Sequence, residues 1–228
     1  MAMGCDGDYF RKSLPLGVSL SGVPLTIAAW FYADDDTSNK VFAALGNSST
    51  THTFMLRLNS SGVFHVVARS GTWAQGSYSA SDHQTGVWHH GCGVFGSNTS
   101  RYAYLDGVAG GENTTSSTPA GMDRIAVGTR ASTGTEHMDG AVAQVGFWNA
   151  ALDASEVAAL AKGYTPDQVR PDSLVFYYPL DNPAGSHDIM DSDTTTDTGS
   201  PVYTFVNPNI IQGKPLTARA NLTRLPGF

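Results

Sequence analysis

Carboxylate side chains are the first residues to consider, because a pair of them can hydrolyse a glycosidic bond. The acid and the nucleophile of a retaining glycosidase lie about 5–5.5 Å apart, a separation that alternate residues on one face of a strand supply. Of the 20 acidic residues only three are glutamates, Glu112, Glu136 and Glu156. Glu156 fits a helix cap, the other two fall in separate predicted loops, and no two aspartates alternate on a predicted core strand. The sequence therefore predicts that the protein is not an enzyme.

Metal ligands and nucleophiles form no strong pattern. His89 and His90 follow Trp88 in a predicted strand, where adjacent side chains point to opposite faces, so we expect a structural role for them. No G-x-S-x-G nucleophile elbow occurs. Calcium stays open as a cofactor, since loop carboxylates are its usual ligands. Two acidic loops could supply these ligands, one with Asp34, Asp35 and Asp36 and the other with Asp188, Asp191, Asp193 and Asp197. Neither loop has EF-hand spacing, and both can equally be solvated. We therefore assign no metal ligand.

Aromatic residues in a polar segment are the best candidates for binding a glycan. Residues 70–85 are mostly small and polar and are predicted to form a loop that carries Trp73, Tyr78 and His83. An exposed ring beside hydrogen-bonding groups can stack on the apolar face of a sugar. The alternative for Trp73 is that its ring closes one end of the hydrophobic core.

The elements that must position these residues are mainly strands. Charged residues make up only 14% of the chain, while Gly and Pro contribute 25 and 11 residues, a mixture typical of all-β proteins with many loops. Residues 24–33 are apolar on both faces and predict a central strand. Further strands are predicted at 40–45, 53–69 (a hairpin), 87–95, 101–108, 123–130, 138–149, 172–180 and 201–206. The D-A-S-E sequence at Asp153–Glu156 has the form of a capping box and predicts one helix over 154–162.

Charge and hydropathy exclude several partners. The net charge of −7 argues against nucleic acid, and no apolar run has the roughly 20 residues that span a membrane. The N-terminal residues also lack an apolar run of signal-peptide length. The only cysteines, Cys5 and Cys92, are too few for a disulfide framework, and their redox state stays open. Residues 181–200 are acidic and residues 207–228 are basic, so the tail either is solvated or docks on an acidic neighbour.

Four segments, taken in order, resemble the laminin-G-like, concanavalin A-like jelly-roll superfamily. PLTIAAWFY is similar to its early core strand, and GVWHHGCGVF with RYAYLDGV to its Trp-His-His strand and Asp-Gly hairpin. DGAVAQVGFWNAALDASEVAAL is similar to its closing strand and short helix. The resemblance implies a two-sheet antiparallel β-sandwich with one short helix and an extended C-terminal arm. It says little about function, because this fold carries lectins, hydrolases and structural modules.

A second resemblance concerns function. The segment AKGYTPDQVRPDSLVFYYPLDN, running on to VNPNII, resembles lectin-like structural proteins of tailed bacteriophages. It implies a non-enzymatic virion protein, such as a capsid decoration protein on the particle surface, that contacts other capsid or tail subunits and forms a homo-oligomer. The alternative is a carbohydrate-binding module that attaches to cell-surface glycans. We expect residues 1–20 to form an N-terminal extension or first strand, 21–206 the sandwich and 207–228 an extended tail.

Overall fold

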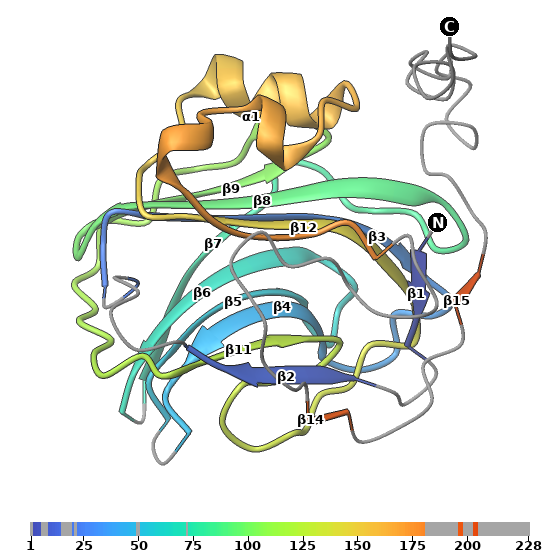
Figure 1. Cartoon of the computed structure of the whole chain (residues 1–228), viewed down its shortest axis with the longest axis horizontal. Helices are drawn as coiled ribbons and strands as arrows, with labels where there is room; N and C mark the ends of the chain where they lie inside the picture. The colour runs from blue at the N-terminus through green and yellow to red at the C-terminus, as the bar shows by residue number, and fades with distance from the viewer. Residues whose placement is uncertain are drawn as a thin grey trace, which may run out of the picture.

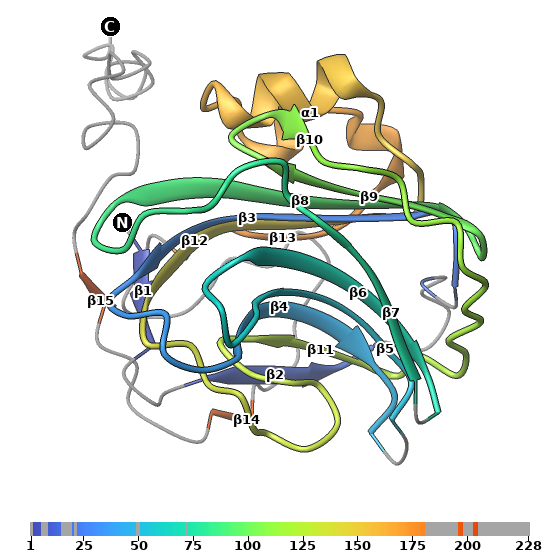
Figure 2. The same cartoon turned by 180° about the vertical axis from the view of Figure 1, so that it is seen from behind.

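The structure is a computed structural model of the chain, and it describes residues 2–5, 9–14, 20, 22–48, 51–71, 73–180, 196–197 and 203–204. Two sheets stack face to face, and a helical layer lies on the outer side of one of them (Figures 1 and 2). Every strand pairing is antiparallel. The predicted sandwich is therefore confirmed, whereas the predicted tail 207–228 lies outside the described residues.

The larger sheet has eight strands in the order β10-β9-β8-β3-β12-β1-β15, and β13 also pairs with β12. Its central strand β3 pairs with β8 on one side and with β12 on the other. The bounds are β1 Ala2–Gly4, β3 Leu25–Ala33, β8 Trp88–Ser97, β9 Ser100–Leu105, β10 Val108–Ala109, β12 Gly140–Trp148, β13 Leu174–Tyr178 and β15 Tyr203–Thr204.

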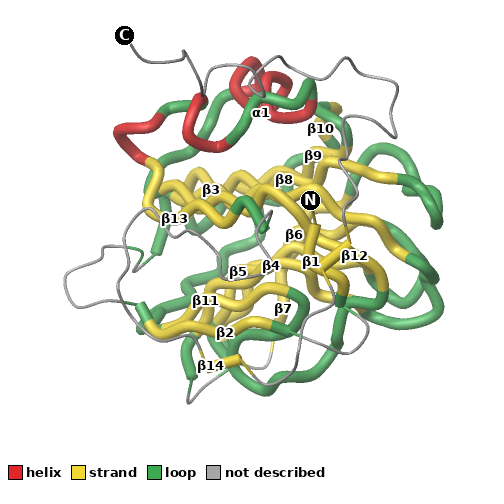
Figure 3. The backbone as a smooth tube through the Cα atoms, turned by 45° about the vertical axis from the view of Figure 1, so that its right-hand side comes forward, coloured by secondary structure: helices red, strands yellow, loops and turns green. Residues whose placement is uncertain are grey.

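The smaller sheet has seven strands in the order β14-β2-β11-β4-β5-β6-β7. Figure 3 shows it as a separate layer facing the larger sheet. The bounds are β2 Phe10–Ser13, β4 Lys40–Gly46, β5 Thr53–Leu58, β6 Phe64–Ser70, β7 Trp73–Tyr78, β11 Arg124–Val127 and β14 Thr196–Asp197.

β7 corrects one expectation, because the sequence predicts a loop over Trp73–Tyr78. The segment lacks the apolar alternation that marks a strand. It pairs through its backbone with β6 at the edge of the smaller sheet, from Ser70↔Trp73 to His65↔Tyr78. An edge strand has a neighbour on one side only and needs little apolar side-chain packing, so small polar residues are tolerated there.

The main core lies between the two sheets. On β3 the side chains of Ile27, Ala29 and Phe31 belong to it, as the alternation in the sequence predicts. The Phe31 ring stacks on Phe42 of β4 with centroids 4.5 Å apart and lies 6.0 Å from Phe64 of β6. These contacts join the centres of both sheets, and such offset-stacked pairs add to the stabilisation that burial itself gives.

The helical layer covers the outer face of the larger sheet. Helix α1, Ala154–Ala161, is the predicted helix, and its N-cap Asp153 forms the predicted capping box with Glu156. Val157 and Leu160 pack in a second apolar cluster with Cys92 and Trp148 of the sheet. The short helices η1, Pro166–Gln168, and η2, Pro171–Ser173, follow. Among the described residues, no helix has the length and apolarity that crossing a bilayer requires.

The two cysteines lie in different layers and are not bonded to one another. Cys5 belongs to the core between the sheets, and Cys92 lies beneath the helical layer. Burial raises the pKa of the Cys92 thiol well above its usual range, which keeps it protonated and unreactive.

Two glycines of β8 allow the sheets to approach closely. A Cβ atom at Gly93 would lie 2.7 Å from Leu56 Cδ2 and 2.8 Å from Val66 Cγ1. A Cβ atom at Gly91 would lie 2.9 Å from a ring carbon of Phe64. Real side chains do not pack this tightly, so the opposing residues would have to move.

We expect Gly93→Ala to lower the free energy of unfolding by about 1–3 kcal/mol, the usual cost of overpacking a core. Urea unfolding of the wild type and the variant measures the difference. Gly111→Ala is the matched control, because a Cβ atom at Gly111 would meet no other atom within 4 Å. Equal unfolding midpoints for Gly93→Ala and Gly111→Ala would contradict the close approach of the sheets at Gly93.

Candidate functional site

The outer face of the smaller sheet carries polar side chains that lie beside a pocket. Strand alternation decides which residues point outward: Phe54, Leu56 and Leu58 of β5 belong to the core, so Thr53, Met55 and Arg57 face away from it. The same alternation on the neighbouring strands leaves further side chains outward. They are Arg11 of β2, Arg124 and Ala126 of β11, His65, Val67 and Arg69 of β6, and Tyr78 of β7.

The loop of residues 128–139 covers part of this face. Ala131 packs in a small apolar cluster with Val41, Ala44 and other outward residues. The Val41 amide donates to the carbonyl of Glu136 at 2.9 Å, which holds the loop against β4. The outer face is therefore occupied by the chain itself over β11 and β4 and also in the middle of β5 and β6, where Met55 and Val67 belong to the same buried cluster.

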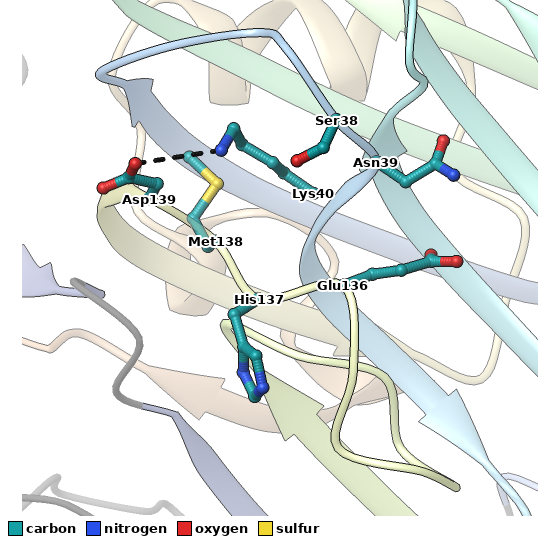
Figure 4. A pocket seen from close by; sticks show the side chains of 7 residues that line it. All are labelled: Ser38, Asn39, Lys40, Glu136, His137, Met138 and Asp139. Carbon is teal, nitrogen blue, oxygen red and sulfur yellow. Dashed lines mark ion pairs between the residues drawn. The ribbon is translucent and has the colours of Figure 1, made fainter.

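A pocket of about 560 Å³ opens where this loop meets the beginning of β4. Figure 4 shows that the side chains of Glu136 and Asp139 point away from one another, so their carboxylates do not form a pair. The pocket is lined by Ser38, Asn39, Lys40, Glu136, His137, Met138 and Asp139. Amide, hydroxyl and carboxylate groups dominate this lining, which suits a polyhydroxylated ligand.

Lys40 holds two carboxylates at the pocket wall. Its Nζ atom lies 3.0 Å from Asp35 and 3.9 Å from Asp139, and its side chain is only 5% exposed. Hydrogen bonds from the Thr37 backbone and from Lys40 hold the pKa of Asp35 well below its usual range. The hydrogen bond with Asp35, followed by burial, raises the pKa of Asp139.

The Asp35–Asp139 pair does not have the geometry of a glycosidase. The two carboxyl groups are hydrogen-bonded to one another, whereas retaining enzymes need about 5–5.5 Å between them and inverting enzymes need more. The buried ammonium of Lys40 also neutralises the pair from within the chain. The Asp35 carboxylate of the proposed calcium loop is thus already engaged.

The other calcium candidates gain no ligand set from the structure. Among the described residues, no group of three or more His, Cys, Asp or Glu side chains could hold a metal ion. The candidates Asp188, Asp191 and Asp193 lie outside the described residues, and of Asp197 only the backbone in β14 is placed. Calcium therefore stays a prediction without assigned ligands.

A row of four polar side chains, Glu136, Arg57, His65 and Tyr78, runs from the pocket across the sheet. Glu136 Oε1 accepts from Arg130 Nη1 at 3.2 Å, and Glu136 Oε2 lies 3.6 Å from Arg57 Nη1. Arg57 Nε donates to His65 Nδ1 at 3.2 Å, so the neutral ring carries its proton on Nε2. Burial and then the Arg57 charge lower the pKa of His65 to about 3.

The row ends in an aromatic stack. The rings of His65 and Tyr78 lie 4.1 Å apart with an interplanar angle of 7°. Tyr78 is 49% exposed, and one face of its ring is covered by His65. A Cβ atom at Gly76 would lie 1.8 Å from His65 Nε2, so only glycine leaves room for this ring. The stack therefore presents a fixed aromatic plane to the solvent.

The three residues predicted for glycan binding are not brought together. Tyr78 is exposed at the end of β7, whereas the backbone of Trp73 lies at its beginning, about 17 Å away along the strand. His83 is 7% exposed, its Nδ1 atom bonds the carbonyl of Gly62, and its ring lies near Phe31. The ring of His83 packs largely in the interior, and the side chain of Trp73 lies outside what the structure describes, so the assignment of these two residues to a glycan site stays a prediction.

His89 and His90 have the structural role that the sequence predicts. His89 Nδ1 bonds Asp106 at 2.7 Å, and its Nε2 accepts from the Gln84 amide at 3.0 Å. His90 points to the opposite face and packs against Trp30 with ring centroids 5.5 Å apart. With both of its nitrogens engaged, His89 is not placed to serve as a general base.

Sequence reasoning missed the residues between the pocket and Tyr78. Arg57 and His65 occupy outward positions of the predicted hairpin. A polar residue at such a position is usually solvated, so the pattern gives no reason to assign it a function. Glu136 falls in a predicted loop, and its sequence neighbours suggest no role for it. The one available signal was that the hairpin carries ionisable groups at directly opposed positions, Arg57↔His65.

The Laminin_G_3 family model, described as the concanavalin A-like lectin/glucanases superfamily, matches residues 6–158. The chain belongs to this superfamily. Its match covers the strands from β2 to β12 and the first part of α1, in agreement with the resemblance found in the sequence. A search of curated proteins finds no match. The resemblance to phage proteins stays a prediction.

Solved structures of the same fold are similar in shape and distant in sequence. A heptameric SAP-like pentraxin from Limulus polyphemus is 15% identical, with a TM-score of 0.56 over 79% of this chain and 88% of that one. A putative carbohydrate binding protein from Bacteroides ovatus is 17% identical, with a TM-score of 0.58 over 87% of this chain and 55% of that one. The CBM40 of a Ruminococcus gnavus sialidase, bound to sialyllactose, is 12% identical, with a TM-score of 0.51 over 67% of this chain and 93% of that one.

We expect the His65 ring to stay neutral, as the Nε2–H tautomer, from pH 8 down to about pH 4, because its pKa lies near 3. The unfolded chain protonates this ring near pH 6.5, so the His65 contribution to stability is complete above that pH and is lost as the pH falls toward 3. Nitrogen-15 NMR of the histidine rings measures both tautomer and pKa. A titration midpoint of His65 near 6.5 would show that the ring is not held against Arg57.

Proposed function

We propose that the protein is a non-catalytic glycan-binding module and that the glycan lies along the polar row of the smaller sheet. The single observation that carries this proposal is the Tyr78 ring, which is half exposed and held flat on His65. Because one face is already packed, the ring loses little conformational freedom when a sugar covers the other. Membership of the superfamily supports the proposal without naming a ligand.

Hydrogen-bonding groups flank the aromatic plane. From Tyr78 of β7 the row passes His65 of β6 and Arg57 of β5 to Glu136 of the covering loop at the pocket. Two strand spacings, about 10 Å, separate Tyr78 from Arg57, and Glu136 Oε2 lies 3.6 Å from Arg57 Nη1. A short oligosaccharide chain can therefore stack on Tyr78 and also reach the polar groups of the pocket.

The described carboxylates support a role without catalysis. Asp35 and Asp139 bond one another and Lys40, and Glu136 is paired with Arg57 and Arg130. Each of these groups is fixed by a neighbour on its own chain. None is poised across a sugar-sized gap from a second carboxylate.

We expect Tyr78→Ala to weaken glycan binding at least tenfold, because the stacking plane is lost. Tyr78→Phe keeps the plane and should retain most of the affinity. Tyr164→Ala is the matched control, because Tyr164 is equally exposed, at 54%, but follows α1 on the opposite side of the sandwich. A glycan array identifies ligands, and titration calorimetry measures the affinity of each variant.

Two results would contradict the proposal. One is a broad glycan array without any ligand for the wild type. The other is a bound glycan whose affinity falls as much in Tyr164→Ala as in Tyr78→Ala. Turnover of a bound polysaccharide, abolished by Asp139→Asn, would instead make the protein an enzyme.

A second candidate function is a structural role in a tailed-phage particle, as the sequence resemblance implies. The observation that favours it is the position of two very short edge strands near the C-terminal end. β15 pairs with β1 at the edge of the larger sheet, and β14 pairs with β2 at the edge of the smaller one. A sheet edge presents unpaired backbone groups to another chain, so a neighbouring capsid or tail subunit could add to either sheet there.

We expect deletion of residues 207–228 to leave a folded sandwich that no longer attaches to particles. Circular dichroism and thermal unfolding check the fold, and gel quantification of purified particles measures occupancy. Gly111→Ala is the control, because this exposed residue is far from β14 and β15 in sequence and its added Cβ atom would meet no other atom within 4 Å. Full occupancy with the truncated protein would rule out attachment through the tail.

A further inference from the structure

Arginine is concentrated on one face of an acidic protein. The chain has a net charge of −7, yet the outer face of the smaller sheet and its covering loop carry five of the arginines. All five side chains are half-buried on this side of the sandwich. They are Arg11 of β2, Arg57 of β5, Arg69 of β6, Arg124 of β11 and Arg130 of the loop.

Few described acidic groups oppose these guanidinium groups. Glu136 pairs with Arg57 and Arg130 together, so one negative charge serves two positive ones. Asp123, which precedes Arg124, accepts from the Ser48 amide and hydroxyl at 2.7 Å each. Asp35 and Asp139 are held by Lys40. The described part of this face therefore keeps an excess of positive charge.

Part of this excess positive charge lies on largely buried guanidinium groups. The side chains of Arg57 and Arg130 are each 16% exposed. Burial lowers the pKa of Arg57, and the charge of Arg130 lowers it further, while Glu136 opposes both effects. The Nε atom of Arg130 is buried and makes no hydrogen bond to the described residues. Like charges in partial burial are costly, and an anion beside them removes part of that cost.

The arginines are spaced too widely for one small anion. Arg69 lies opposite Thr53, and Thr53 is four residues from Arg57 on β5, about 13 Å along the sheet. Arg124 and Arg69 lie at the same level, three strands apart and therefore about 14 Å from one another. A ligand that meets several of them must itself carry charges at intervals.

We infer that the ligand of this face is an acidic polysaccharide, whose carboxylate or sulfate groups meet the arginines while a sugar ring stacks on Tyr78. This inference rests on the proposed glycan-binding function and adds the chemical class of the ligand. Guanidinium groups suit both anions, because their paired N–H groups match two oxygens. The aromatic plane at the end of the arginine face favours a saccharide over a polymer without sugar rings.

The test compares polymers that differ in charge. Affinity electrophoresis of the full chain in gels that contain polygalacturonate, dextran sulfate or neutral dextran gives three dissociation constants. We expect retardation by at least one acidic polymer, at least tenfold tighter than by dextran. The binding should weaken as the salt concentration rises, because exposed charges are then screened. Comparison of the dissociation constants for polygalacturonate and dextran sulfate shows whether the face prefers carboxylate or sulfate groups.

Variants locate the charge effect. Arg69→Gln and Arg124→Gln leave the Arg57–Glu136–Arg130 group intact, and we expect each to weaken binding of the acidic polymer about three- to tenfold. Lys162→Gln is the matched control, because this exposed residue also loses one positive charge but lies at the end of α1 on the other side. Equal urea midpoints confirm that the variants are folded.

The outcomes separate this inference from the function on which it rests. If dextran or another neutral glycan binds as well as the acidic polymers, and Tyr78→Ala abolishes it, the glycan site stands and its acidic specificity is overturned. If single-stranded DNA binds as tightly as the acidic polymers and Tyr78→Ala leaves all of these dissociation constants unchanged, the face binds polyanions by charge alone and the inference fails. If no glycan of any kind binds, the proposed function fails with it.

Discussion

The packing of Phe31 between Phe42 and Phe64 is the contact on which the rest of the structure depends. It joins the central strand of the larger sheet to two strands of the smaller one. The glycines at 91 and 93 allow the opposing side chains to sit directly on the backbone of β8. Because interiors are close-packed, this contact sets the separation of the sheets. With the separation set, β4, β5 and β6 have one face committed to the core, while their outer face carries the loop of residues 128–139, a small buried apolar cluster and the polar side chains.

On the outer face of the smaller sheet, the ion pairs of Glu136 with Arg57 and Arg130 determine which part of the face is covered. They bind the loop of residues 128–139 to β5 and so cover the part over β11 and β4. Arg57 in turn fixes the tautomer of His65, and His65 supports Tyr78. One chain of contacts thus links the pocket wall to the aromatic plane. Its members come from three consecutive strands, β5, β6 and β7, and from a loop that follows much later in the sequence.

Much of the fold could be predicted from local pattern, because each element carries its own signal. β3 shows apolar residues on both faces, the β5–β6 hairpin alternates, and Asp153 with Glu156 marks the start of α1. β7 could not be found in this way, because its residues lack apolar alternation and it is held at the sheet edge by backbone pairing with β6 and by the stacking of Tyr78 on His65. The candidate site was only partly predictable. Tyr78 was identified from its type and surroundings, whereas His83, of similar character, packs against Phe31. Whether such a residue turns outward depends on how its segment docks on the sheets: Tyr78 lies on an edge strand, whereas His83 lies in the connection between β7 and β8 that packs against the core.

The helical layer on the larger sheet gives the molecule a front and a back. α1 and the short helices after it lie on the side opposite the arginine face (Figure 1). A sandwich lying with the smaller sheet against a flat glycan coat would hold α1 outward, away from the coat. Tyr164, exposed just beyond that helix, is then a natural attachment point for a fluorophore or a surface tether that leaves the opposite side unobstructed. The same asymmetry would give every adsorbed molecule one common orientation.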